Sequence, residues 1–162
     1  MAESLVAINM EYRRDVMAFQ SAMQELVATG QGVAPECQLT HRFIPPDTKY
    51  GCSVYAREIF MPAGSVIVGK IHRHVHMLFL LQGIIVVKTE QGLSRLVAPQ
   101  TLISEAGVKR ALYVEEDAIV TTVHLTEHAG EEWLEEIEDE VIAPSYEELA
   151  LAESTGMKEI VE

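Results

Sequence analysis

Three histidines within five residues form the most chemically informative stretch of this chain. His72, His74 and His76 lie between two apolar runs, and Gly83 follows seven residues after the last of them. Imidazole is the commonest protein ligand for metals such as zinc, iron and nickel, and it is the side chain that titrates near neutral pH. This window therefore predicts a site, and either metal binding or polar ligand binding is the chemistry it favours.

The geometry of the cluster depends on the local backbone. In one straight strand, residues two apart share a face, so Lys70, His72, His74 and His76 would all point the same way. A tight turn at residues 73–75 would instead end one strand at His72 and begin its neighbour at His76. The two imidazoles would then converge inside the fold, with His74 at the rim.

The converging arrangement suits a divalent metal ion. Such an ion needs three or four donors at about 2.0–2.2 Å, so another residue must contribute. His124, at the end of the apolar run 118–123, is the best candidate. Three interpretations stay open: a bound Zn, Fe, Mn or Ni ion, a metal-free polar pocket, or a polar stripe facing solvent.

The elements that position these residues follow from periodicity. Apolar residues at helical spacing predict a helix over 11–29, and similar spacing after Gly130 predicts a helix over 131–142. The sequence Ser145-Tyr146-Glu147-Glu148 is typical of a capping box that opens a second short helix. Between them, short segments rich in Val, Ile and Tyr predict an antiparallel barrel or sandwich. The expected strands are 53–60, 65–72, 77–81, 84–89, 93–97, 101–104, 109–114 and 118–125.

Charge and composition exclude some partners. The chain has 162 residues, 48% of them apolar, and a net charge of −13. From Glu127 onward there are 13 acids and one base, so the acidity belongs to the carboxyl-terminal segment, and this disfavours nucleic-acid binding. No apolar stretch is long enough for a membrane span. The two cysteines are expected to be free thiols, and the expected compartment is the cytoplasm.

The histidine window and the glycine that follows it resemble motifs of the cupin superfamily. The first cupin motif runs Gly, five residues, His-x-His, three or four residues, Glu, six residues, Gly. Anchoring its last glycine on Gly83 places His76 at the Glu position, His72 at the second His and Lys70 at the first His. In the second motif the glycine matches Gly107, and Arg110 replaces the histidine.

The resemblance covers roughly residues 53–125 and implies a jelly-roll barrel, the double-stranded β-helix. The chain departs from the cupin motifs at several ligand positions, and two kinds of site are consistent with these departures. His72 and His76 with a displaced donor, His124 or His74, would rebuild a metal centre. Alternatively, Lys70 and Arg110 would form a cationic pocket for a carboxylate or phosphate, which Arg can bind with two parallel hydrogen bonds, and Tyr113 could line it.

The expected organisation is an amino-terminal helix with a connecting segment over 1–52, a cupin-like barrel over 53–126 and an acidic helical segment over 127–162. Ala98-Pro99, the Gly-Val-Lys-Arg sequence at 107–110 and the Thr-Thr-Val-His sequence at 121–124 also resemble small cupin-like proteins of tailed phages. This resemblance implies a protein of the host cytoplasm or a component of the virion. Three function classes remain: a small-molecule binding module, a metal-dependent dioxygenase, isomerase or hydrolase, and a structural protein. A homodimer is expected, because cupin barrels commonly pair and the apolar stripes of both long helices exceed what one barrel needs.

Overall fold

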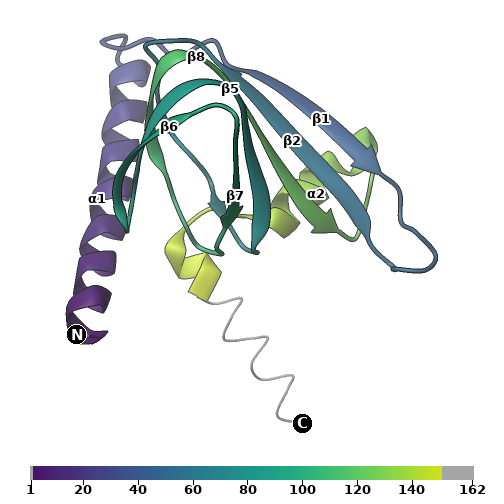
Figure 1. The fold of residues 1–162 in the computed structure, drawn as a ribbon. Coiled ribbons are helices and arrows are strands. Elements are labelled where there is room, and N and C mark those ends of the chain that lie inside the picture. Colours follow the sequence, from purple (N-terminus) through teal and green to yellow (C-terminus); the bar gives the residue numbers. More distant parts are fainter. Residues whose placement is uncertain (1, 151–162) are drawn as a thin grey trace.

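A long amino-terminal helix stands beside a curved sheet in the computed structural model, which describes residues 2–150 and, for side chains, residues 9–150 (Figure 1). Helix α1 (Ala2–Ala28) begins earlier than the predicted 11–29. It docks through Val16, which is buried, and through the Tyr12 hydroxyl, which lies 2.9 Å from the carbonyl oxygens of Lys88 and Lys109. In the described part of the chain, no helix combines the length and apolar character needed to cross a membrane.

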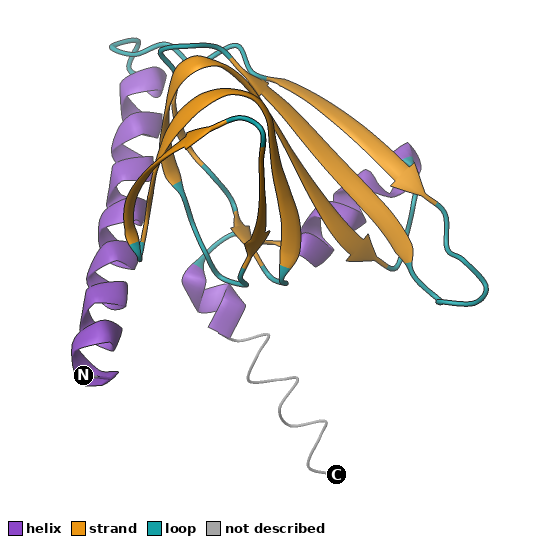
Figure 2. Ribbon diagram, in the orientation of Figure 1, coloured by secondary structure: helices purple, strands orange, loops and turns teal. Residues whose placement is uncertain are grey.

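The sheet is antiparallel, with the spatial order β1-β2-β8-β5-β6 (Figure 2). Its main strands are β1 (Gln38–Ile44), β2 (Ser53–Met61), β5 (His76–Thr89), β6 (Gly92–Val97) and β8 (Ala111–Thr126). Two short strands extend it, β3 (Val66–Val68) on β8 and β7 (Gln100–Ser104) on β5. The expected mainly β, antiparallel fold with an amino-terminal helix is confirmed. The ladder curls but does not close into a ring among the described residues, in contrast to the predicted barrel.

Two of the strands are longer than predicted because they contain bulges. The segments 77–81 and 84–89 form one strand, β5, and the segments 109–114 and 118–125 form one strand, β8. Their pairing shifts register between Leu80 and Ile85. Gly83, at φ 86°, approaches β8 so closely that a Cβ there would clash with the Asp117 carbonyl oxygen. The bulge interrupts the alternation of buried and exposed residues, and the sequence pattern therefore predicted a break.

The connecting segment contains a strand that the sequence pattern did not predict. β1 pairs with β2 along its whole length, but it lies at the edge of the sheet and most of its residues are exposed. An edge strand buries little apolar surface, so it lacks the apolar run by which central strands are recognised. The predicted strand 65–72 is also divided, into β3 and β4 (Ile71–His72).

The carboxyl-terminal elements close one end of the curved sheet. After a turn of 3-10 helix (Glu131–Trp133), helix α2 (Leu134–Val141) packs Ile137 and Val141 against Tyr55 of β2. Strand β9 (Ile142–Ala143) then pairs with β4. Residues 146–150 are helical, and the Ser145 hydroxyl accepts a hydrogen bond of 3.2 Å from the Glu148 amide, as the capping box predicted. The rest of that predicted helix lies outside the described residues.

The main apolar core fills the concave side of the sheet between β5 and β8. It is built from alternating inward-facing residues that include Leu78, Leu80 and Val120. Towards the end closed by α2, the next inward position on β5 is His76, and on β8 Thr122 and then His124 follow Val120. The histidines therefore form the polar end of an otherwise apolar interior.

Candidate metal centre

Three imidazoles converge at the closed end of the sheet. His72, His76 and His124 each offer one ring nitrogen, and these atoms all lie within 4.8 Å of one another. The ring centroids of His72 and His76 are 4.4 Å apart, those of His76 and His124 4.5 Å, and those of His72 and His124 5.0 Å. Nitrogens at this spacing could share one metal ion after small side-chain adjustments.

The strand register explains why two of the histidines meet. Met77 of β5 pairs with Val123 of β8, so the next pair along the ladder is His76 and His124, with both side chains on the concave face. Alternation places these two imidazoles next to Leu78 and Thr122 on that face.

His72 reaches the site from a different element. It ends β4, whose register opposite Ile142 of β9 fixes its position, and its carbonyl oxygen accepts a hydrogen bond of 2.9 Å from the Gly107 amide. The turn at residues 73–75 then returns the chain to His76. The sequence had allowed for this arrangement: His72 ends one strand and His76 begins the next.

Burial keeps these imidazoles neutral. His76 and His124 are buried, and His72 is partly buried. Burial, together with the neighbouring His76 and His124 rings, lowers the pKa of His72 to about 2. Burial and the His76 ring lower the pKa of His124 to about 3, and burial also lowers the pKa of His76. A neutral imidazole keeps a ring-nitrogen lone pair, which is the form that binds a metal.

The hydrogen bonds leave ring nitrogens free. His76 Nδ1 donates to the His74 carbonyl oxygen at 3.0 Å, so His76 Nε2 carries the lone pair, and this buried atom has no partner. His72 Nδ1 is also buried without a partner. His124 Nε2 lies 3.0 Å from the Thr122 hydroxyl, which leaves its Nδ1 for a ligand. Buried polar atoms are almost always satisfied, so two unpartnered nitrogens in one cluster fit the donor set of a divalent ion.

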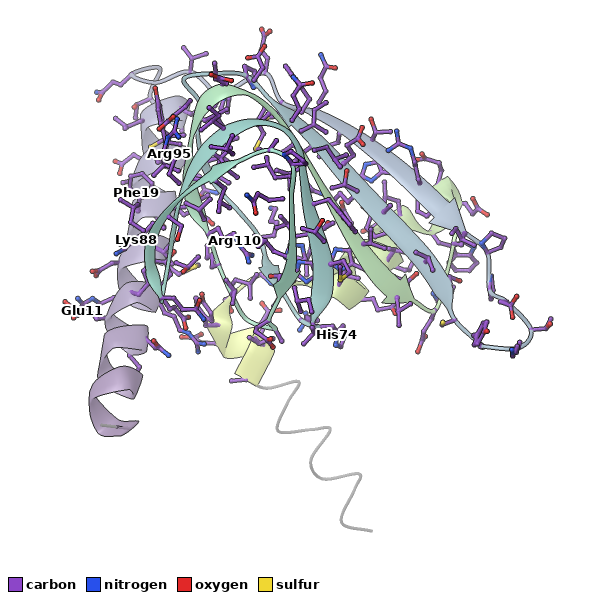
Figure 3. All side chains as sticks on the ribbon, viewed as in Figure 1. Glu11, Phe19, His74, Lys88, Arg95 and Arg110 are labelled. Carbon is purple, nitrogen blue, oxygen red and sulfur yellow. The ribbon has the colours of Figure 1, made fainter. Side chains whose placement is uncertain are left out.

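Two guanidinium groups accompany the histidines. Arg57 of β2 pairs with Thr122 of β8, and its Nε is buried without a hydrogen-bond partner, at 4.0 Å from a Glu138 carboxylate oxygen. Arg110 precedes β8 on the inward-curving side of the sheet (Figure 3), and burial lowers its pKa. Each contributes a positive charge that disfavours protonation of His72. The surroundings of the site are therefore cationic although the chain is acidic.

One further polar atom faces this region. Ser104 of β7 pairs with His76, and its hydroxyl is buried with no partner. Sequence reasoning missed both Ser104 and Arg57. Each is a polar residue at an inward-facing position of a strand, which is the sequence feature that could have identified it. Without the pairing register of the strands, however, the sequence does not show that either residue lies near the histidines.

Three of the predicted site residues lie elsewhere. His74 is exposed at the end of the sheet where β5 begins, and it contributes only its carbonyl oxygen (Figure 3). Lys70 lies between the end of β3 and the start of β4. Its side chain is exposed and lines an open groove of about 930 Å³ beside α1. Tyr113 is exposed on β8, opposite Val66. The structure therefore brings together His72, His76 and His124, with Arg110 close by.

Carboxylates of the sheet region are engaged away from the histidines. Glu58 lies 3.2 Å from Arg42, and Glu90 lies 2.7 Å from Arg13. Within the described residues, the group that could hold a metal consists of histidines alone. Such an ion would keep its full charge in this site until an exogenous ligand reached it.

No protein-family model matches the chain, and no curated protein matches it. Among solved structures, KdgF from Halomonas sp. aligns with a TM-score of 0.46 and 20% identity over 60% of this chain and 86% of that protein. A cupin domain from Bordetella pertussis aligns with a TM-score of 0.43 and 16% identity, over 59% of this chain and 99% of that one. An acetylacetone dioxygenase from Acinetobacter johnsonii aligns with a TM-score of 0.41 and 21% identity, over 58% and 66%. These similarities concern the fold alone.

Proposed function

We propose that this chain is a cupin-type metal-binding protein in which His72, His76 and His124 hold one divalent ion. The observation that carries the proposal is the convergence of three neutral imidazoles, two of them with a buried ring nitrogen that has no partner. Zn, Fe, Mn and Ni all accept imidazole ligands. Three protein ligands leave at least one coordination position open, and a small molecule would bind there.

The proposed ligand is anionic. Three neutral imidazoles leave a divalent ion with its charge uncompensated, and the Arg110 guanidinium adds to it. The charge of Arg57 is partly offset by Glu138, whose carboxylate oxygen lies 4.0 Å from its Nε. A ligand with a carboxylate group would balance this charge, and an arginine can bind such a group through two parallel hydrogen bonds. The buried Ser104 hydroxyl is a further donor that lacks a partner. The sequence had suggested Lys70, Arg110 and Tyr113 for this pocket. The proposal keeps Arg110 and puts Arg57 in place of the exposed Lys70 and Tyr113.

A metal-dependent enzyme of the dioxygenase, isomerase or hydrolase type is the second candidate. The open coordination positions favour it, because a metal can polarise a ligand that reaches it. The histidine cluster contains no carboxylate among the described residues that could serve as a general base beside the metal. The binding role therefore remains the first proposal.

The proposed location is the cytoplasm, where reduced thiols persist, since Cys37 and Cys52 are both free. The resemblance to small cupin-like phage proteins supports the cytoplasm of an infected host. A homodimer is proposed as the assembly.

The test of the metal centre is elemental analysis with native mass spectrometry of protein purified without an affinity tag. We expect close to one divalent ion per chain, and loss of this ion in the variant with both His72→Ala and His76→Ala, because one imidazole cannot hold the ion alone. His74→Ala is the matched control, since it removes a neighbouring exposed imidazole, and it should keep the metal. Stoichiometric metal in the double variant would contradict the assignment.

A further inference from the structure

The convex face of the sheet carries apolar side chains that no part of the described chain covers. Met77 of β5 pairs with Ile103 of β7 and with Val123 of β8, and Val123 pairs in turn with Ala56 of β2. These residues alternate along their strands with the inward-facing ones, so they form a row across the outside of the sheet.

A second row runs beside the first. Leu125 of β8 pairs with Val54 of β2, and Val54 pairs with Ile44 of β1. Val75, which directly precedes β5, and Leu125 each lie two residues beyond the Met77–Val123 pair, and both are exposed. We call the two rows together the outer apolar patch, which consists of Ile44, Val54, Ala56, Val75, Met77, Ile103, Val123 and Leu125.

The side chains of the patch are open to solvent. Five of them are between 37% and 69% exposed: Ile44, Val75, Met77, Ile103 and Leu125. Helix α2 cannot cover them, because it packs against Tyr55 and Phe43 on the opposite face of β1 and β2. The ribbon view likewise places α1 and α2 away from the convex face of these strands (Figure 1). An apolar surface of this extent on a folded domain is typical of an interaction site.

We propose that the outer apolar patch is the contact between two copies of this chain. The five exposed side chains present roughly 500 Å², so two patches facing each other would bury about 1,000 Å², which reaches the lower bound of a specific interface. A partner without an apolar surface of its own would not remove this area from water as effectively. A two-fold axis brings the same patch to itself, and two sheets pack well face to face.

Charge also favours a second copy at this surface. Each chain carries a net charge of −13, so two copies repel each other, and this repulsion is least where they meet through surfaces without charge. The eight residues of the patch include no charged side chain. The charged residues next to it on the same face are Arg42 and Glu58, and these lie 3.2 Å from each other. The patch is thus a neutral surface on an acidic molecule.

This surface differs from the helix faces that the sequence suggested for pairing. The apolar stripe of α2 is used inside the chain, since Ile137 and Val141 are both buried. Helix α1 uses Val16 to dock. Its second half borders the open groove, where Val33, 93% exposed, is the most exposed apolar residue. That groove is the rival surface, and the experiment must distinguish the two.

Sedimentation velocity of the full-length protein between 5 and about 100 µM tests the proposal. The unsubstituted protein should sediment as a dimer. The variant with both Ile103→Lys and Leu125→Lys should sediment as a monomer, with dimerisation at least about 100-fold weaker, because buried like charges would face each other across the two-fold axis. Val33→Lys, a matched control at an exposed apolar residue of the groove, should remain a dimer.

Several results would overturn the proposal. These are an unsubstituted monomer at about 100 µM, a dimer that survives both lysines, or a dimer that Val33→Lys dissociates. Binding of a different protein to the patch in place of a second copy would also overturn the proposal. Circular dichroism and metal content show whether the lysine variant is folded. If it is not, Ile103→Thr with Leu125→Thr keeps the strand preference and should still weaken dimerisation at least tenfold. Because the metal ligands are not changed, failure of this proposal leaves the metal proposal standing, and the reverse also holds.

Discussion

The metal-free protein should lose stability when the pH falls from 7.5 to 5.5. The cause is the difference between the histidine pKa values of the folded and unfolded chains. His72 and His124 change from an ordinary value of 6.5 to about 2 and about 3 in the folded protein. Acid therefore protonates the unfolded chain first and favours unfolding. The stability contributed by these neutral rings is complete above pH 6.5, and it is lost progressively as the pH falls towards their folded pKa values.

The size of the effect follows from the two pKa values. At pH 5.5 an unfolded imidazole is protonated about ten to one, while both buried rings stay neutral. Each buried ring then lowers the free energy of unfolding by about 1.4 kcal/mol relative to pH 7.5. His72 and His124 together lower it by about 3 kcal/mol. The lowered pKa of His76 acts in the same direction. This is a large share of the about 5–15 kcal/mol that stabilises a typical domain.

Urea unfolding at pH 7.5, 6.5 and 5.5 in the presence of a chelator measures this dependence. The range stays above the ordinary pKa of carboxyl groups, so the acidic carboxyl-terminal segment contributes little to it. His124→Gln should reduce the change in unfolding free energy by about 1.4 kcal/mol, whatever its effect on stability at pH 7.5. His74→Gln is the matched control, because it removes a neighbouring exposed imidazole that lies outside the three-histidine cluster. A stability that stays constant from pH 7.5 to 5.5 would refute the reasoning.

Three further predictions concern the sheet and the site. Gly83→Ala should lower the free energy of unfolding by about 3 kcal/mol or more, measured by urea unfolding, because its Cβ would contact the Asp117 carbonyl in a backbone conformation that disfavours side chains. Ile137→Ala should cost about 2–4 kcal/mol in the same assay, because it leaves a cavity against buried Tyr55. Arg57→Gln should keep the metal content but weaken the binding of a small carboxylate about tenfold, measured by calorimetry on the metal-loaded protein. An unchanged affinity would remove Arg57 from the ligand site.

The sequence predicted those features that are local. Helical periodicity identified α1 and α2, and the turn at residues 73–75 between His72 and His76 was one of two arrangements it allowed. The predicted carboxyl-terminal boundary of β5 also agrees with the structure, because the sequence Glu90-Gln91-Gly92 is a strong turn signal. These features depend on neighbours within a few residues, which the sequence alone contains.

The missed features depend on pairing between distant segments. β1 is recognisable only beside β2, and Arg57 belongs to the site only because β2 pairs with β8. Lys70 matched the cupin motif by spacing, but a change of strand after β3 turns it to solvent. Assigning site residues from motif spacing assumes that the strands are regular. The chain is irregular both around β4, which is only two residues long, and at the bulge at Gly83.

The position of His72 has a consequence for how the protein is made. Its strand, β4, is two residues long, and its ladder partner is β9, near the carboxyl-terminal end of the described chain. During synthesis His72 and His76 are joined to the chain before His124, and Ile142 and Ala143 are joined later still. The three-histidine cluster therefore cannot form until the segment up to Ala143 has been synthesised. Until then His72 lacks its strand partner, so stable metal binding should require synthesis through β9.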